Sequence, residues 1–242
     1  MDGVIDMEQA RAIVGNAVLW PRVRDFLWDF AGQVHPSWLV GLENLEALAR
    51  LEQQIDLLHL DSPRVKRFIL AQLEVAPCFH AFPKDDGSRL LLLNGVTLED
   101  IVRWLGAIVC VEDLRRVTDG ATVKALKAAL PGVYPEVFGY VAYFSSLGFQ
   151  RSDAAGRSVE EAIVLAGHEF LATALSGLPA SLFSRLKFKF PKDSPFAALA
   201  SRIMSGAEGG REALDARREK ARSHIFKLLK LKFPEAYSLC CS

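Results

Sequence analysis

The chain has 242 residues, which is enough to bury a substantial hydrophobic core as one large or two small domains without disulfides. Its 29 Lys and Arg residues balance its 29 Asp and Glu residues, so no overall charge attracts nucleic acid or an anionic membrane. The N-terminus shows neither a signal-peptide nor a stop-transfer pattern. The longest apolar run, residues 104–111, is far shorter than the about 20 residues that a membrane span needs.

Chemistry-bearing residues occur without the spacings that catalysis or metal binding requires. The cysteines, Cys78, Cys110, Cys240 and Cys241, form no CxxC motif, and we interpret the compartment as reducing cytoplasm. The five histidines are scattered, and no phosphate-binding glycine loop or nucleophile motif occurs. We therefore expect a protein that is not an enzyme and that uses no metal, cofactor or small-molecule substrate.

Apolar residues recur at steps of three and four along most of the chain, which predicts an all-α, compact multi-helix protein. Within residues 7–30 we expect two helical pieces divided at Pro21, and then a helix from about Ser37 to Leu60. Asp61-Ser62-Pro63 predicts the start of another helix. Turn residues in 82–89 suggest an N-terminal helical subdomain, 1–84, and a main helical domain, 85–242, unless the two form one continuous domain.

The most apolar region, residues 90–120, is interpreted as the buried centre of a helical domain. Residues 90–93 are either a short strand or an extended arm, and Thr97 with Asp100 resembles a capping box that would start a helix. The apolar stripe changes phase near Glu112, so we expect two helices that meet between Cys110 and Asp113. A third helix is predicted over residues 122–130, before Pro131-Gly132.

The C-terminal half continues the helical pattern. We expect helices from Pro135 to about residue 147 and, after a Ser158–Glu161 capping box, to Gly177. The alternating segment RLKFKFP, residues 185–191, is a strand, a helix end or an extended arm. A short helix to Met204 and a long final helix over residues 211–232 complete the prediction.

The final helix has the strongest local charge pattern in the chain. Between residues 217 and 232 a single acid, Glu219, accompanies seven basic residues: Arg217, Arg218, Lys220, Arg222, Lys227, Lys230 and Lys232. An apolar stripe of Ala221, Ile225 and Leu228 runs alongside them. The helix is either docked on the body with a solvated basic face, or it binds an acidic protein partner, nucleic acid or anionic lipid.

Several short motifs, taken in order and spacing, resemble the type III secretion sorting-platform K subunit, the SctK/YscK family. They are Leu93-Asn94-Gly95 at a helix entry, Leu105-Gly106 within that helix, Arg115-Arg116 in the next helix, and Arg185-Leu186 ahead of Pro191, with VHPSWL upstream and the basic helix downstream. The resemblance covers most of the chain, is strongest over residues 89–131, and does not clearly extend before residue 30.

The resemblance implies a non-enzymatic, mainly helical adaptor at the base of the bacterial injectisome. Such proteins connect the cytoplasmic domains of the inner-membrane ring protein, SctD, to the SctQ pods, which in turn reach the stator SctL and the ATPase SctN. It places the protein in the bacterial cytoplasm, at the cytoplasmic face of the inner membrane when assembled.

Polar residues of the central helices and of the final helix are the candidate partner-binding residues. They are Arg103, Arg115, Arg116, Arg217, Arg218, Lys220, Arg222, Lys227 and Lys230. Arg115 or Arg116 could instead cap carbonyl groups or brace a neighbouring helix. The alternative function is a helical nucleic-acid-binding protein that uses the basic final helix, and a third is an unrecognised helical enzyme.

Overall fold

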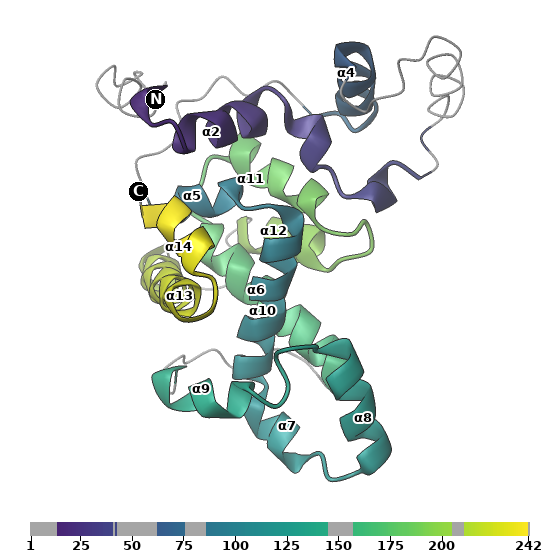
Figure 1. Ribbon diagram of the computed structural model, residues 1–242, viewed down its shortest axis with the longest axis vertical. Coiled ribbons are helices and arrows are strands. Elements are labelled where there is room, and N and C mark those ends of the chain that lie inside the picture. The colour runs from purple at the N-terminus through teal and green to yellow at the C-terminus, as the bar shows by residue number, and fades with distance from the viewer. Residues whose placement is uncertain are drawn as a thin grey trace. The chain divides into compact units, whose positions relative to one another are not determined.

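Figure 1 shows a computed structural model, which describes residues 14–40, 42, 62–75, 86–144, 157–204 and 211–241. Every regular element in these ranges is an α-helix or a 3-10 helix, and the ranges contain no strand. The prediction of an all-α protein is therefore confirmed. The predicted helix over residues 37–60 falls largely outside the described residues, and so does the first half of the turn segment 82–89. The second half of that segment is a short helix, Asp86–Arg89, so the turn prediction is wrong there. None of the described helices is both long and apolar enough to cross a membrane.

The backbone contacts divide the chain into two units, each built from segments that are distant in sequence. Unit 1 comprises Met1–Gly95, Leu178–Ser194 and Ser238–Ser242, and unit 2 comprises Val96–Gly177 and Pro195–Tyr237. The predicted domain boundary after residue 84 stays a prediction, because residues 76–85 are not described. A segment near residue 185 thus belongs to the same unit as the first helices of the chain.

Unit 1 is assembled from short helices around a shared aromatic core. Its helices are α2 (Leu19–Leu27), η1 (Phe30–Gln33), η2 (Pro36–Trp38), α4 (Pro63–Gln72), α5 (Asp86–Arg89), η3 (Leu90–Leu92), α11 (Ala180–Leu186) and η4 (Lys187–Lys189). α2 contacts η1 and η3, and α4 contacts η1. Phe26 and Phe30, both fully buried, meet edge to face with 5.5 Å between ring centroids.

The predicted division of the first helix at Pro21 is wrong. Pro21 lies in the first turn of α2, where its missing N–H costs no intrahelical hydrogen bond. The helix begins after Asn16, whose side-chain oxygen accepts hydrogen bonds from the amides of Val18 and Leu19 at 3.0 and 2.9 Å. An Asn that supplies acceptors to the first amides therefore decides where this helix starts.

Two apolar segments that the sequence left open between several structures are 3-10 turns. Leu90–Leu92 forms η3, so the strand and extended-arm predictions for residues 90–93 are both wrong. Lys187–Lys189 forms η4 directly after α11, so the helix-end interpretation of RLKFKFP holds and the strand is wrong. The alternation in this segment does not separate solvent from core, because Phe188, Lys189 and Phe190 are all buried.

The end of α4 contains a non-glycine residue in the left-handed region. Glu74 has φ 53°, and its amide donates to the carbonyl of Ala71 while the amide of Val75 donates to Leu70. These two hydrogen bonds make a Schellman motif, whose left-handed position normally holds glycine because a Cβ there is strained. Glu74 therefore stores local backbone strain at the end of this helix.

Replacing Glu74 with glycine is expected to raise the free energy of unfolding by about 1 kcal/mol, because the left-handed strain disappears. Gln72→Gly is the matched control. Gln72 is a helical residue of α4, so glycine there should lower stability by about 1 kcal/mol. Urea denaturation followed by circular dichroism measures both, and the same sign for the two variants would contradict this assignment.

Unit 2 consists mainly of longer helices. They are α6 (Gly95–Val109), α7 (Val111–Arg116), α8 (Gly120–Ala129), α9 (Val137–Phe144), α10 (Val159–Leu175), α12 (Phe196–Met204) and α13 (Arg211–Lys232), followed by α14 (Pro234–Cys241), which ends in unit 1. α10 packs against both α12 and α13, and α7 packs against α9.

Most of the predicted helix ends in unit 2 are confirmed. Cys110 separates α6 from α7, as the phase change of the apolar stripe predicts. Ser158 and Glu161 form the predicted capping box, with hydrogen bonds of 3.2 and 2.9 Å. Three starts are wrong: α6 begins at Gly95 rather than at Thr97, α8 begins at Gly120 rather than at Thr122, and α9 begins at Val137 after turn residues that include Pro135.

α6 and α10 cross (Figure 1). Their backbones are in contact at two glycines. A Cβ on Gly106 would lie 1.9 Å from the carbonyl oxygen of Ile163, and one on Gly167 would lie 2.0 Å from that of Val102. No side chain larger than hydrogen fits between these backbones. The crossing therefore fixes α10, and α10 in turn carries α13, the helix with the basic residues.

Candidate functional site

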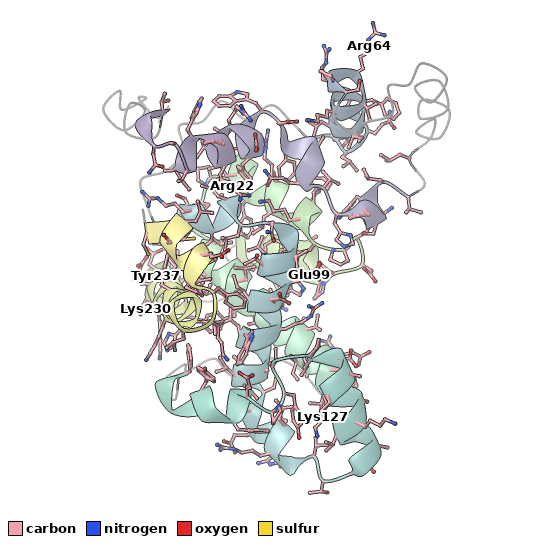
Figure 2. The ribbon with its side chains drawn as sticks, in the orientation of Figure 1. Arg22, Arg64, Glu99, Lys127, Lys230 and Tyr237 are labelled. Atoms are coloured by element: carbon pink, nitrogen blue, oxygen red, sulfur yellow. The ribbon has the colours of Figure 1, made fainter. Side chains whose placement is uncertain are left out.

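α13 presents opposite faces of different chemistry. Its buried face consists of Ala221, Ile225, Leu228 and Leu229, all at 0% exposure, and packs within unit 2, where α13 lies against α10. The exposed face carries three of the predicted partner-binding residues, Lys220, Lys227 and Lys230 (Figure 2 labels Lys230). With Ser223 these residues are spaced by three, four and three positions, so they lie along one side of the helix. We call Lys220, Ser223, Lys227 and Lys230 the lysine face.

The arginines of α13 are engaged inside unit 2. The Nε of Arg222 donates to the carbonyl of Ala174 at 2.7 Å, close to the C-terminus of α10, where a cation meets the negative end of the helix dipole. Arg218 pairs with Asp215 at 2.8 Å, and its guanidinium fills the space beside Gly177, where a Cβ would lie 2.5 Å from Nη1. These contacts fasten α13 to the end of α10.

Two further basic residues of α13 also have partners within unit 2. Arg217 lies 4.0 Å from the buried carboxylate of Glu169. Lys232 pairs with Glu136, and its Nζ lies 4.6 Å from the ring centroids of both Trp104 and Tyr140. The sequence pattern treated all seven basic residues as one group, whereas the structure separates arginines and Lys232, which brace the helix, from the lysine face.

The predicted arginines of the central helices make pairs within their own helices. Arg103 on α6 lies 3.2 Å from Glu99, labelled in Figure 2, and 3.0 Å from Asp100. Arg115 on α7 lies 2.6 Å from Glu112, and Arg116 is exposed. Such pairs, which are exposed at Arg115 and partly exposed at Arg103, contribute about 0 to 1 kcal/mol each, so a partner could exchange them at little cost. A role for these three residues in binding stays a prediction.

Unit 1 contains two buried basic side chains whose structural roles were not predicted from the sequence. Arg185, 3% exposed, donates from Nη1 to the carbonyls of Phe26 and Leu27 at 2.7 and 3.0 Å and so caps the C-terminus of α2. Lys189, 1% exposed, donates to the carbonyls of Leu91 and Leu93 at 2.5 and 2.7 Å. Both replace helix-end hydrogen bonds that water would otherwise make.

The described residues contain no group of three or more His, Cys, Asp and Glu side chains that could hold a metal ion. His168 is almost fully buried against Phe196, and burial lowers its pKa to about 4, which keeps the ring neutral.

Residues 26–240 match the family of the YOP proteins translocation protein K (YscK). The chain belongs to this family. It is accordingly a protein of the type III secretion apparatus and of protein transport. No curated protein and no solved structure matches the chain significantly.

The motifs by which the sequence resembles this family fall mainly at packing positions. Gly106 lies at the crossing of α6 and α10, and Arg185 caps α2. The carbonyl of Leu93 accepts a hydrogen bond from Lys189. Gly95 lies close to the backbone of Lys189, because a Cβ on Gly95 would be 2.6 Å from the carbonyl oxygen of Lys189. These motif residues therefore serve backbone packing and helix capping within the fold.

Proposed function

We propose that this YscK-family protein is a non-enzymatic adaptor of the sorting platform, which links the cytoplasmic domains of the SctD ring protein to the SctQ pods. Through SctQ it is connected to the stator SctL and the ATPase SctN. It acts in the bacterial cytoplasm, at the cytoplasmic face of the inner membrane. The observation that carries this proposal is the family match over residues 26–240.

The lysine face is the surface of unit 2 that we assign to one of these partners. Its three lysines lie on a helix whose opposite face is fully buried, so the backbone that carries them is positioned by packing on α10 rather than by a loop. Complementary acidic residues on the partner would speed association and select the correct orientation. An adaptor of this kind works through binding geometry, because it offers separate surfaces to the proteins that it joins.

The double variant Lys227→Glu/Lys230→Glu is expected to weaken the retention of one partner about tenfold or more, because it places anions on the docking surface. Lys124→Glu/Lys127→Glu on α8 is the matched control, with exposed lysines at the same spacing of three (Figure 2 labels Lys127). Co-purification with SctQ and with the SctD cytoplasmic domain, in mild salt, measures retention.

The outcomes of this experiment separate the function from the surface. If the unaltered protein retains neither SctQ nor SctD, the adaptor proposal is wrong. If it retains both, and the α13 variant retains them as well as the α8 control does, the adaptor proposal holds and the lysine face is not a docking surface.

The same lysines are also the basis of the alternative function, nucleic-acid binding. Neutralising phosphates with lysine releases counterions, so the affinity for a generic oligonucleotide would fall steeply as salt increases. Titration of the unaltered protein with an oligothymidylate at two salt concentrations tests this alternative. Absence of binding at low salt removes it.

A further inference from the structure

Unit 1 contains an open groove of about 270 Å³ that the sequence did not indicate. One side of the groove is formed by η2 and η4, and the other by the end of α4. Trp38 and Phe188 line it, with 4.9 Å between their ring centroids in an edge-to-face arrangement. Phe188 is buried, whereas Trp38 is partly exposed. The groove thus has an aromatic surface that another molecule can reach.

The aromatic side of the groove is held in place by three hydrogen bonds between segments distant in sequence. The amide of His35 donates to the carbonyl of Phe188 at 2.7 Å, and the indole N–H of Trp38 donates to the carbonyl of Phe190 at 2.9 Å. The amide of Lys192 donates to the hydroxyl of Ser37 at 2.9 Å. Because the indole is fixed before a ligand arrives, binding at this side requires little ordering of side chains.

Two lysines lie over the aromatic rings and bring positive charge to this side. The Nζ of Lys187 is 4.6 Å from the ring centroid of Phe188, and that of Lys192 is 5.9 Å from Trp38. Both residues line the groove, and Lys192 is exposed. Carboxylates of a bound molecule would therefore be attracted to the η4 side of the groove.

The end of α4 lines the groove with two polar residues, Gln72 and Glu74, and one apolar residue, Leu73. Val40, 77% exposed, adds an uncovered apolar side chain to the lining. Glu74 is the residue that occupies the left-handed position where glycine would be unstrained. A strained residue at the edge of a groove is typical of a functional constraint.

We propose that this groove binds an acidic segment of a protein partner, which inserts one apolar side chain beside Trp38 and places its carboxylates near Lys187 and Lys192. The inference gives the proposed adaptor a second docking site and rests on that function for the kind of partner. Glu74 favours a peptide as the occupant, because peptide N–H groups can donate to its carboxylate, whereas a phosphodiester backbone offers no N–H donor. The apolar lining from Val40 and Leu73 also favours an aliphatic side chain.

Binding is tested with the full chain and short capped peptides. The ¹⁵N-labelled protein is titrated with GSEELEESG, with the basic peptide GSKKLKKSG, and with GSEEGEESG, which lacks the apolar residue. The indole N–H signal of Trp38, assigned with Trp38→Phe, is the reporter. We expect GSEELEESG to shift this signal and to bind about tenfold or more tightly than either of the other peptides, since both the charge and the apolar residue contribute.

Variants then assign the binding to the groove. Lys187→Glu/Lys192→Glu should abolish the shift, and Lys124→Glu/Lys127→Glu on α8 should leave it unchanged. Thermal unfolding of each variant shows whether it is folded. The proposal is overturned if GSEELEESG causes no shift, if the basic peptide binds equally well, or if the groove variant binds as the α8 control does.

Other occupants give distinct results. Tighter binding of an oligothymidylate at the Trp38 signal would reassign the groove to nucleic acid. A peptide of residues 43–61, which is itself acidic and apolar, could bind more tightly than GSEELEESG, and this result would reassign the groove to a segment of the chain itself. Shifts of the Trp38 signal that depend on protein concentration, without any peptide, would reassign it to a second copy. Retention of SctQ and SctD is measured separately, so loss of the groove proposal leaves the adaptor proposal standing.

Discussion

Gly106→Ala is expected to destabilise unit 2 by more than about 4 kcal/mol, because the new methyl group would overlap a backbone atom. The Cβ would lie 1.9 Å from the carbonyl oxygen of Ile163. This oxygen belongs to the backbone of α10, which cannot relieve the overlap by a change of side-chain rotamer. Gly167→Ala should have a similar effect, since its Cβ would lie 2.0 Å from the carbonyl oxygen of Val102. Urea denaturation followed by circular dichroism measures the loss.

Gly139→Ala on α9 is the control for these variants. Gly139 is also helical, but a Cβ there meets nothing within 4 Å, so alanine should raise stability by about 1 kcal/mol. The double variant Gly106→Ala/Gly167→Ala should be less destabilising than the sum of the two single changes, because both disrupt the same crossing. If Gly106→Ala leaves the midpoint of urea denaturation unchanged, the backbones of α6 and α10 are not in contact at this position.

The helix crossing also connects the family pattern to the proposed surface. α10 lies against α6 at the glycines and against α13 with its lysine face. A glycine variant is therefore expected to displace the lysine face without changing any residue in it. For this reason the test of function changes exposed lysines of α13 rather than residues of the crossing.

Features that depend on neighbouring residues could be predicted from the sequence. The break at Cys110 was predicted because the apolar stripe changes phase within one helical turn of it. The capping box at Ser158 was predicted because both hydrogen bonds join residues three positions apart. The ends of α13 follow from the same local pattern of apolar and charged residues.

Features that depend on distant residues could not be predicted. Lys189 alternates with two phenylalanines and has the pattern of a solvated lysine, but its acceptors are carbonyls 98 and 96 positions away. Arg222 reaches the carbonyl of Ala174 from the edge of its helix, because a long side chain can bury its stem and still place its charged end. The groove is likewise formed by η2 and η4, which no sequence period relates.

Lys189→Met is expected to destabilise unit 1 by about 2 to 5 kcal/mol, because two buried carbonyl groups lose their donor. Leu91 and Leu93, which supply these carbonyls, are at most 3% exposed, so water does not replace the ammonium there. Methionine has a comparable shape and fills the volume of the lysine stem. The loss therefore measures the two hydrogen bonds rather than a cavity, and exposed Lys127→Met on α8 is the control.

The same residue should make stability depend on pH in a defined direction. Burial, with a further contribution from the charge of Arg22, lowers the pKa of Lys189 from 10.5 to about 7. Between these two values the unfolded chain binds more protons than the folded one, so the free energy of unfolding rises with pH. The slope is at most about 1.4 kcal/mol per pH unit, and the rise is absent below pH 7, where both states carry the proton.

Deprotonation does not break the site, because a neutral amine keeps two N–H donors for the carbonyls of Leu91 and Leu93. The stability difference between the unaltered protein and Lys189→Met should therefore be larger at pH 9.5 than at pH 6.5. Urea denaturation of both proteins at the two pH values measures this difference, and Lys127→Met should show none. A difference that is equal at the two pH values would mean that Lys189 stays charged in the folded protein, held by the carbonyls and by the ring of Phe26 at 5.0 Å.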